Sequence, residues 1–211
     1  MFSGREQLQE TGGDTVRDID GNVYRTVKIG KQIWMAENLK VKHYRNGEDI
    51  PNVSDNATWE GLTTGAYCEY CNDVENAAIY GRLYNWYAVN DSRHLAPLGW
   101  HVPSDNEWRT LVDRLGGNEI AGGKMKEVGT GHWKSPNTGA TNRSGFSALP
   151  GGGRDSIGSF SKMGEVVYFW SCTWNPDGAG NRILSWRSSN SDSLNICLNP
   201  KNGFSVRCVK D

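Results

Sequence analysis

The order of hydrophobic patterns along this chain constrains its fold more than any other feature. Helical spacing occurs in the middle, at residues 76–91 and 102–117, whereas the segments before and after alternate with the period of strands. Because helical and strand patterns are segregated, the order argues against repeated βαβ units and predicts an α+β fold. At 211 residues, the chain is long enough to bury a sizeable core in one domain.

A capping box marks the later and clearer of the two predicted helices. Ser104 and Glu107 have the S-x-x-E spacing, in which each side chain bonds the backbone amide of the other. The residues that follow form one apolar stripe ending at a glycine pair: Trp108, Leu111, Val112 and Leu115. We expect Asn76 to cap the earlier helix. Residues 122–129 predict a further short turn of helix.

The N-terminal part of the chain divides into three predicted segments. Residues 1–14 have low hydrophobicity, and we expect them to be a disordered extension before a single domain at 15–211. Asp20-Gly21 lies between two alternating runs and predicts a β-hairpin. Residues 43–76 are rich in Asn, Asp and Gly, which favours long surface loops.

The last third of the chain reads as short strands separated by turns. The runs are "GFSALPGGGR", "VVYFWSCTW", "RILSWRS", "SLNICLN" and "FSVRCVK". The glycines before Arg154 lack the preceding buried strand and following helix of a phosphate-binding loop. They predict instead a close approach of two backbones.

Composition narrows the classes of partner. Lys plus Arg number 23 and Asp plus Glu number 24, so net charge gives no general attraction to nucleic acid or to a membrane surface. No apolar run approaches the roughly 18 residues of a membrane span. The polar start lacks the apolar core of a signal peptide, so we expect no signal peptide in this chain. The 26 glycines and 9 tryptophans favour a loop-rich fold over a helical bundle.

Six ordered motifs resemble one bacterial family, the Fibrobacter succinogenes major paralogous domain, which is frequent in Bacteroidetes. They are "DIDGNVYRTVKIGKQIWMAENLKV", "YGRLYNWYAVND", "GWHVPSDNEWRTLV", "GFSALPGGGR", "YFWSCT" and "GFSVRCVKD". The resemblance covers about residues 15–211. It implies a C-type-lectin-like fold related to formylglycine-generating enzymes, with two helices flanking a small twisted antiparallel sheet. It also implies that ligands bind the outer strands and loops of the C-terminal half.

The chain departs from the family pattern in its C-terminal part. Cys172 stands where "WSST" is usual, Cys71 is atypical, and residues 175–202 follow no fixed pattern. Some relatives with this fold are variable proteins of diversity-generating retroelements, in which a reverse transcriptase alters adenine-templated codons in a C-terminal segment. The Asn, Ser, Arg and Ile content of residues 175–202 resembles such a segment.

The alternation inside this segment predicts a hairpin with one packed face and one outward face. Leu184 and Trp186 in the first strand, and Leu194, Ile196 and Leu198 in the second, are expected to point inward. The predicted outward residues are Asn181, Ile183, Ser185, Arg187, Asn195, Cys197 and Asn199. Trp174 lies in the preceding loop and could anchor a ligand. Such a mixture of polar residues with large anchors is typical of binding surfaces, although a plain solvated hairpin remains the alternative.

The cysteines leave several alternatives open. Cys68 and Cys71 have C-x-x-C spacing, but zinc would need a second pair and a thioredoxin-like site would need a different helical context. A disulfide between Cys68 and Cys208 is one possibility. A copper-binding pair among Cys172, Cys197 and Cys208 is another, and small buried apolar residues are the simpler reading.

No other motif predicts a metal site or a catalytic group. The "NPDG" loop at 175–178 offers too few oxygen ligands for calcium and fits an ordinary turn. The four histidines, at 43, 94, 101 and 132, show no metal-ligand spacing. We therefore expect no catalytic residue, no metal and no cofactor.

These observations favour a non-enzymatic module that binds a protein or glycan ligand at a cell surface. The most specific form of this hypothesis is a receptor diversified by a retroelement. We expect an extracellular location or a cell or virion surface, with possible homo-oligomerisation, and neither nucleic acid binding nor membrane insertion. The alternatives are a copper-dependent oxidase of the formylglycine-generating type and a structural module of a cell-surface assembly.

Overall fold

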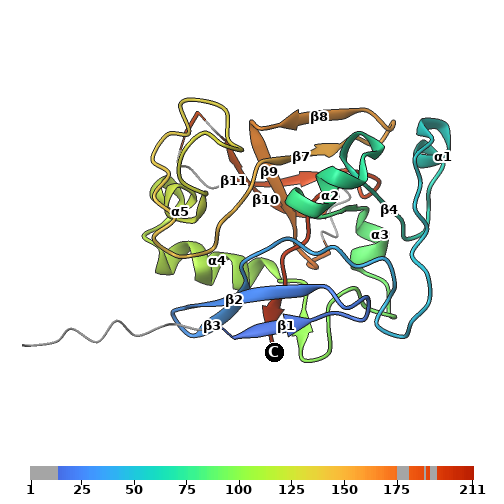
Figure 1. Cartoon of the computed structure of the whole chain (residues 1–211), viewed down its shortest axis with the longest axis horizontal. Coiled ribbons are helices and arrows are strands. Elements are labelled where there is room, and N and C mark those ends of the chain that lie inside the picture. The colour runs from blue at the N-terminus through green and yellow to red at the C-terminus, as the bar shows by residue number, and fades with distance from the viewer. Residues whose placement is uncertain (1–13, 175–180, 188, 191–193) are drawn as a thin grey trace, which may run out of the picture.

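A computed structural model shows a mixed α and β fold in which most strand pairs are antiparallel and the helices are short (Figure 1). The structure describes residues 14–174, 181–187, 189–190 and 194–211, and at 181–187 and 194–197 it describes only the backbone. The predicted N-terminal extension therefore lies outside the described residues, apart from its last residue. In the described parts, no helix is both long and apolar enough to span a bilayer.

The first sheet joins the two ends of the chain in the order β1-β2-β3-β12-β6. Its strands are Thr15–Arg17, Val23–Ile29, Gln32–Met35, Val209–Lys210 and Trp100–His101. The predicted N-terminal hairpin is confirmed, since Arg17 of β1 pairs with Val23 of β2 across the Asp20-Gly21 turn. The C-terminal β12 pairs with β3 and β6, which places the end of the chain inside this sheet.

The second sheet has the order β11-β10-β9-β7-β8 and is formed by the last third of the chain. The strands, in chain order from β7, are Gly151–Arg154, Phe160–Met163, Val166–Trp170, Asn181–Arg187 and Leu194–Leu198. A single parallel bridge between Gly152 and Val167 joins β7 to β9, and the other pairs are antiparallel. A small third sheet pairs β4, Tyr67–Cys68, with β5, Leu83–Tyr84.

The helices lie mainly in the middle of the chain. They are α1 Asn56–Glu60, the 3-10 turn η1 Tyr70–Asn72, α2 Val74–Tyr80, α3 Trp86–Val89, α4 Asp105–Arg114 and α5 Asn118–Met125. The capping box of α4 is confirmed, because Ser104 and Glu107 each bond the backbone amide of the other. The predicted turn at 122–129 begins earlier, as α5.

The single helix predicted at 76–91 is wrong. The segment forms α2, β5 and α3, with Asp73 rather than Asn76 as the N-cap of α2. The chain breaks at Gly81, which has φ 78° and whose added Cβ would lie 2.6 Å from Cβ of Asn38. The apolar periodicity was correct for burial, but a helix cannot continue through this conformation.

The expected surface loops at 43–76 are also corrected, because this segment contributes to the core. Tyr44, Trp59, Ala66 and Cys68 are fully buried. The Asn, Asp and Gly residues between them form turns that return these side chains to the interior.

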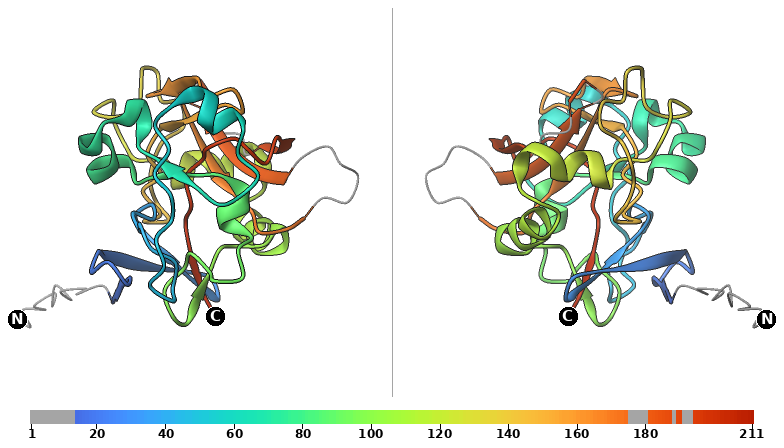
Figure 2. Two further views of the ribbon diagram at one scale, coloured as in Figure 1. Left: turned by 90° about the vertical axis from the view of Figure 1, so that its right-hand side faces the viewer. Right: turned by 90° about the vertical axis from the view of Figure 1, so that its left-hand side faces the viewer.

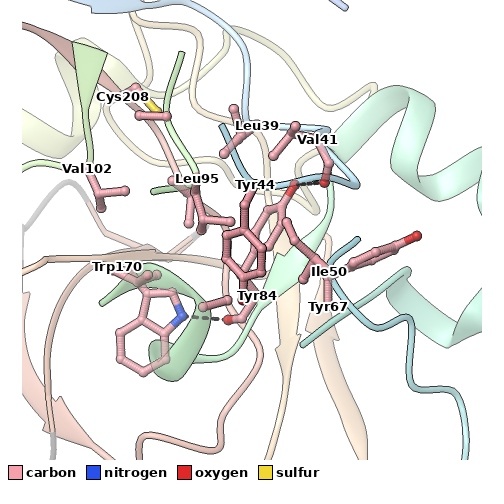
Figure 3. Packing of buried hydrophobic residues seen from close by; sticks show 14 of the residues in the cluster. Leu39, Val41, Tyr44, Ile50, Tyr67, Tyr84, Leu95, Val102, Trp170 and Cys208 are labelled. Carbon is pink, nitrogen blue, oxygen red and sulfur yellow. Dashed lines mark hydrogen bonds between the residues drawn. The ribbon is translucent and has the colours of Figure 1, made fainter. Parts of the chain in front are cut away.

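Three buried clusters fill the fold. The largest contains Tyr84 and Trp170, which Figure 3 shows bonded through the Trp170 Nε1 to the Tyr84 carbonyl oxygen at 2.6 Å. A second cluster packs the apolar stripe of α4 against Val167 and Phe169 of β9. Because Trp170 and Phe169 point into different clusters, both faces of β9 are covered, which explains its continuous apolar run.

Candidate functional site

The β10–β11 hairpin lies within a loop whose two ends are held side by side in the core. The chain leaves the core after Ser171, and it is buried again from Asn202 onward. The Trp170 amide donates to the Ser205 carbonyl oxygen at 3.1 Å, and the Ser205 amide donates to the Tyr168 carbonyl oxygen at 3.1 Å. Phe204 exchanges two backbone bonds with Tyr84. We call these backbone bonds, which join the segments on either side of β10 and β11, the closed base. Figure 2 shows the strands of the hairpin in orange and red.

Two fully buried arginines hold the segments around this base. Arg207 donates to Asn38 Oδ1, to the Phe146 carbonyl oxygen at 2.5 Å and to the Met35 carbonyl oxygen. Burial lowers the pKa of Arg207 to about 9. Arg154 likewise donates to backbone carbonyls of Val53, Ser54 and Gly158. The motifs "GGGR" and "SVRC" therefore supply structural side chains.

The close contacts of this segment with Gly203 and Phe204 explain why glycines precede Arg154. Gly203 and Arg154 exchange backbone bonds, and a Cβ on Gly153 would lie 2.7 Å from the ring of Phe204. The predicted close approach of two backbones at "GGGR" is confirmed.

The buried Lys126 connects residue 190, in the turn after β10, to the segment before β7 by hydrogen bonds. The Lys126 ammonium donates to the Asn190 carbonyl oxygen at 2.7 Å and to the Thr138 carbonyl oxygen at 2.9 Å. It also lies 5.3 Å from the ring centroid of Trp133. Burial lowers the pKa of Lys126 to about 8. The turn at 189–190 is thereby tied to the segment before β7.

The strand register corrects the predicted outward face of the hairpin. Ser185 pairs with Leu194, and Leu184 pairs with Asn195. Directly paired residues share a face of the sheet. The odd-numbered positions of β10 therefore share a face with the even-numbered positions of β11. The β10 positions 181, 183, 185 and 187 share a face with Tyr168 of β9, whereas positions 195 and 197 lie on the face of Phe169. The seven positions therefore do not form one surface.

We call the face that carries Asn181, Ile183, Ser185 and Arg187 of β10 the Tyr168 face, which also carries Tyr168 and the buried Val166 and Trp170 of β9. Leu194, Ile196 and Leu198 of β11 lie on this same face, so the prediction that they point away from the four β10 positions is wrong. The exposure of the β10 and β11 side chains at 181–187 and 194–197 lies outside what the structure describes. The binding roles of these positions, including Asn195 and Cys197, remain predictions.

The structure describes the side chains of two further predicted ligand-binding residues, Trp174 and Asn199. Trp174 is 56% exposed, and its ring centroid lies 5.0 Å from that of the buried Trp86. Trp174 therefore exposes an aromatic ring that packs against Trp86, beside the base of the hairpin. Asn199 is exposed, but its side chain accepts from the Lys201 amide and so forms a turn after β11. The "NPDG" loop at 175–178 lies outside the described residues.

A polar groove adjoins the Tyr168 face at its Arg187 end. We call it the lysine groove, a cavity of about 460 Å³ whose lining includes Lys134, Lys162, Glu165, Tyr168 and Ser189. Glu165 Oε1 lies 2.9 Å from the Lys134 ammonium, and Oε2 lies 3.4 Å from the Lys162 ammonium. These bonds lower the pKa of Glu165, so it is ionised at neutral pH. Sequence reasoning missed this groove because its residues come from separate segments, namely the loop at 134–135, the β8–β9 region and the turn at 189.

A second cavity, of about 320 Å³, is lined by histidine and cysteine side chains. It contains His94, His101 and Cys172. Both ring nitrogens of His101 face carboxylates, with Nδ1 2.6 Å from Asp211 and Nε2 2.7 Å from Glu107. Burial raises the pKa of Cys172, so its thiol is protonated at neutral pH. The His101 contacts join the segments that carry Glu107 and Asp211. The protonated Cys172 thiol is not an activated nucleophile.

The other cysteines give no metal or redox geometry in the described residues. Cys68, Cys71 and Cys208 are free thiols, so the possible Cys68–Cys208 disulfide is not formed. Burial raises the pKa values of Cys68 and Cys208 to about 12. The described side chains also include no cluster of three metal-ligating residues. The Cys197 side chain lies outside this description.

Comparison with known proteins identifies one match. The sequence profile described as the Fibrobacter succinogenes major domain matches residues 27–210, nearly nine-tenths of the chain. No curated protein and no solved structure gives a significant match.

Proposed function

The chain belongs to the Fibrobacter succinogenes major domain family, and from its structure we propose that it is a ligand-recognition module with a C-type-lectin-like fold. The recognition surface consists of the Tyr168 face of β10, the exposed Trp174 and the adjoining lysine groove. The module binds by shape and hydrogen-bond complementarity and carries out no covalent chemistry. Its ligand is a protein or glycan at a cell or virion surface.

The closed base is the observation that carries this proposal. Its bonds, from the Trp170 amide to Ser205 and from the Ser205 amide to Tyr168, are made by backbone atoms, so they do not depend on the identity of the hairpin side chains. Loops on a rigid scaffold are the usual place for binding residues. Such an arrangement also suits sequence variation, which supports the retroelement hypothesis.

Binding measurements with two matched variants test the proposal. Wild-type protein is applied to glycan arrays and to bacterial cell surfaces, beside a variant with alanine at the four Tyr168-face positions of β10. The control has alanine at three exposed positions of the opposite hairpin, namely Val23, Lys28 and Lys31. We expect binding by the wild type and control and its loss in the β10 variant. No binding by the wild type, or equal binding by all three, would contradict the proposal.

Diversification has a separate test in the neighbouring DNA. We expect a reverse transcriptase gene and a near-copy of the codons for about residues 175–205, with mismatches confined to adenines of the copy. A locus without such a copy would defeat the retroelement hypothesis and leave the binding proposal in place.

A further inference from the structure

We propose that the lysine groove binds an acidic monosaccharide unit, with its carboxylate held by Lys134 and Lys162. This inference rests on the proposed function of ligand recognition and names the chemical class that one part of the surface accepts. The volume of about 460 Å³ lies within the roughly 300–1,000 Å³ of typical small-ligand sites.

The two lysines supply the charge for a carboxylate. Each ammonium has three N–H donors and uses one for Glu165, at 2.9 Å from Lys134 and 3.4 Å from Lys162. Two positive charges against one negative charge leave the groove with a net charge of about +1. A carboxylate that enters beside Glu165 can therefore bond both lysines.

The position of the lysines is fixed by the backbone rather than by their side chains alone. The Lys134 amide donates to the Gly164 carbonyl oxygen at 2.7 Å, and the Glu165 amide donates to the Lys162 carbonyl oxygen at 3.0 Å. These bonds hold the loop before β7 against the β8–β9 turn. The two ammonium groups consequently approach the same carboxylate from different segments.

The remaining lining favours a sugar ring over an acidic peptide. Tyr168 supplies an aromatic ring, itself packed 4.7 Å from the ring centroid of Phe204. Ser135 and Ser189 supply hydroxyl groups, and Glu165 supplies acceptor oxygens, which suit the several hydroxyls of a sugar. An acidic peptide would instead need a row of apolar pockets for its side chains, and among the described lining residues Val166 is the one aliphatic side chain.

Titration of the whole chain with three small probes, followed by amide NMR shifts, tests the inference. Glucuronate carries the ring and the carboxylate, glucose carries the ring alone, and glutarate carries carboxylates without a ring. We expect glucuronate to shift amides at 134–135, 162–168 and 189, with an affinity at least tenfold higher than that of glucose or glutarate. Equal affinity for glucose, equal affinity for glutarate, or no localised shifts would overturn the inference.

Variants of the groove separate the roles of its charges. The double variant Lys134→Gln with Lys162→Gln should weaken glucuronate binding at least tenfold. Glu165→Gln keeps an acceptor oxygen but releases both ammonium groups, so binding should become two- to fivefold tighter. Lys28→Gln, an exposed lysine on β2, is the matched control and should leave the affinity unchanged. Equal effects of all three changes would contradict a site in the groove.

The two proposals fail in different ways. If glucuronate does not bind while the β10 variant still loses binding on arrays or cells, the acidic-sugar inference alone is wrong. If glucuronate binds the groove but the wild type recognises no array or cell, the proposed function of the hairpin is wrong.

Discussion

At the residue scale, buried cations with neutral partners organise this protein. Arg207 and Arg154 have carbonyl and amide oxygens as their acceptors in the described contacts. A buried guanidinium is costly unless its donors are satisfied, and these side chains bond segments that are far apart in sequence. Their position beside the closed base makes them the residues on which the hairpin frame depends.

Replacing Arg207 by Met should lower the free energy of unfolding by about 3 kcal/mol, because it leaves Asn38 Oδ1 and the Phe146 carbonyl oxygen without this donor. Urea denaturation measures the change. Arg17→Met removes an exposed arginine and should cost no more than about 0.5 kcal/mol. Equal losses in the two variants would show that the buried bonds do not stabilise the fold.

His101 gives the stability a pH dependence with a defined sign. Burial lowers the pKa of His101, but its bonds to Asp211 and Glu107 outweigh burial and raise the pKa above the usual value. The stabilisation is therefore fully present below the unfolded pKa of about 6.5, while the carboxylates are ionised, and is lost as pH rises through the folded pKa. We expect His101→Gln to destabilise more at pH 5.5 than at pH 8.5.

The effect should stay below about 1 kcal/mol, since the imidazole is partly exposed and its ion pairs are screened by solvent. Urea denaturation at the two pH values measures it. The control is His94→Gln, which changes an exposed histidine outside the His101 ion pairs. A His101 variant whose cost does not change with pH would contradict this role.

At the scale of elements, glycine conformation decides where α2 ends. Gly81 and Gly99 have nearly equal φ angles, 78° and 77°, but an added Cβ would clash only at Gly81. Gly99→Ala should cost about 1–2 kcal/mol from backbone strain. Gly81→Ala should cost clearly more, because its Cβ also meets the Leu39 carbonyl oxygen at 2.9 Å. Thermal unfolding compares the stability of the two variants. Equal losses of stability would mean that the contacts of Gly81 with Asn38 and Leu39 relax to accommodate the added Cβ.

The tether between Lys126 and the hairpin turn is a second prediction about an element. Lys126→Met keeps most of the apolar volume but removes the donor to the Asn190 carbonyl oxygen. We expect faster amide hydrogen exchange in β10 and β11 than in the wild type, with smaller changes in β2 and β3. Lys124→Met, whose ammonium donates to the Leu115 carbonyl oxygen, is the neighbouring control. Unchanged exchange in the hairpin would contradict the tether.

At the scale of the whole molecule, the sequence predicted local elements better than long-range relations. The capping box of α4 and the first hairpin depend on neighbouring residues, and both predictions were correct. The break at Gly81 depends on Asn38, and the parity of β11 depends on its register with β10. These relations link residues through space, so alternation within one segment cannot reveal them.

In the candidate site too, the local features were predicted from the sequence and the long-range ones were not. The sequence identified the hairpin and the exposed Trp174, and the structure describes both. The lysine groove combines Lys134, Lys162 and Ser189 from three segments, and none of these segments carries a recognisable motif. The motifs "GGGR" and "SVRC" instead supply Arg154 and Arg207, whose buried side chains bond backbone carbonyl oxygens of distant segments.

A mutational scan of residues 170–210, made in the full-length chain and read out by folding, is the sharpest test of a frame that carries a changeable surface. Every residue in this range is varied, and folded protein is measured by resistance to proteolysis. We expect β10 positions 181, 183, 185 and 187 to accept most substitutions, while Trp170, Phe204 and Arg207 accept few. Equal intolerance at the β10 positions would contradict a frame that carries a changeable recognition surface.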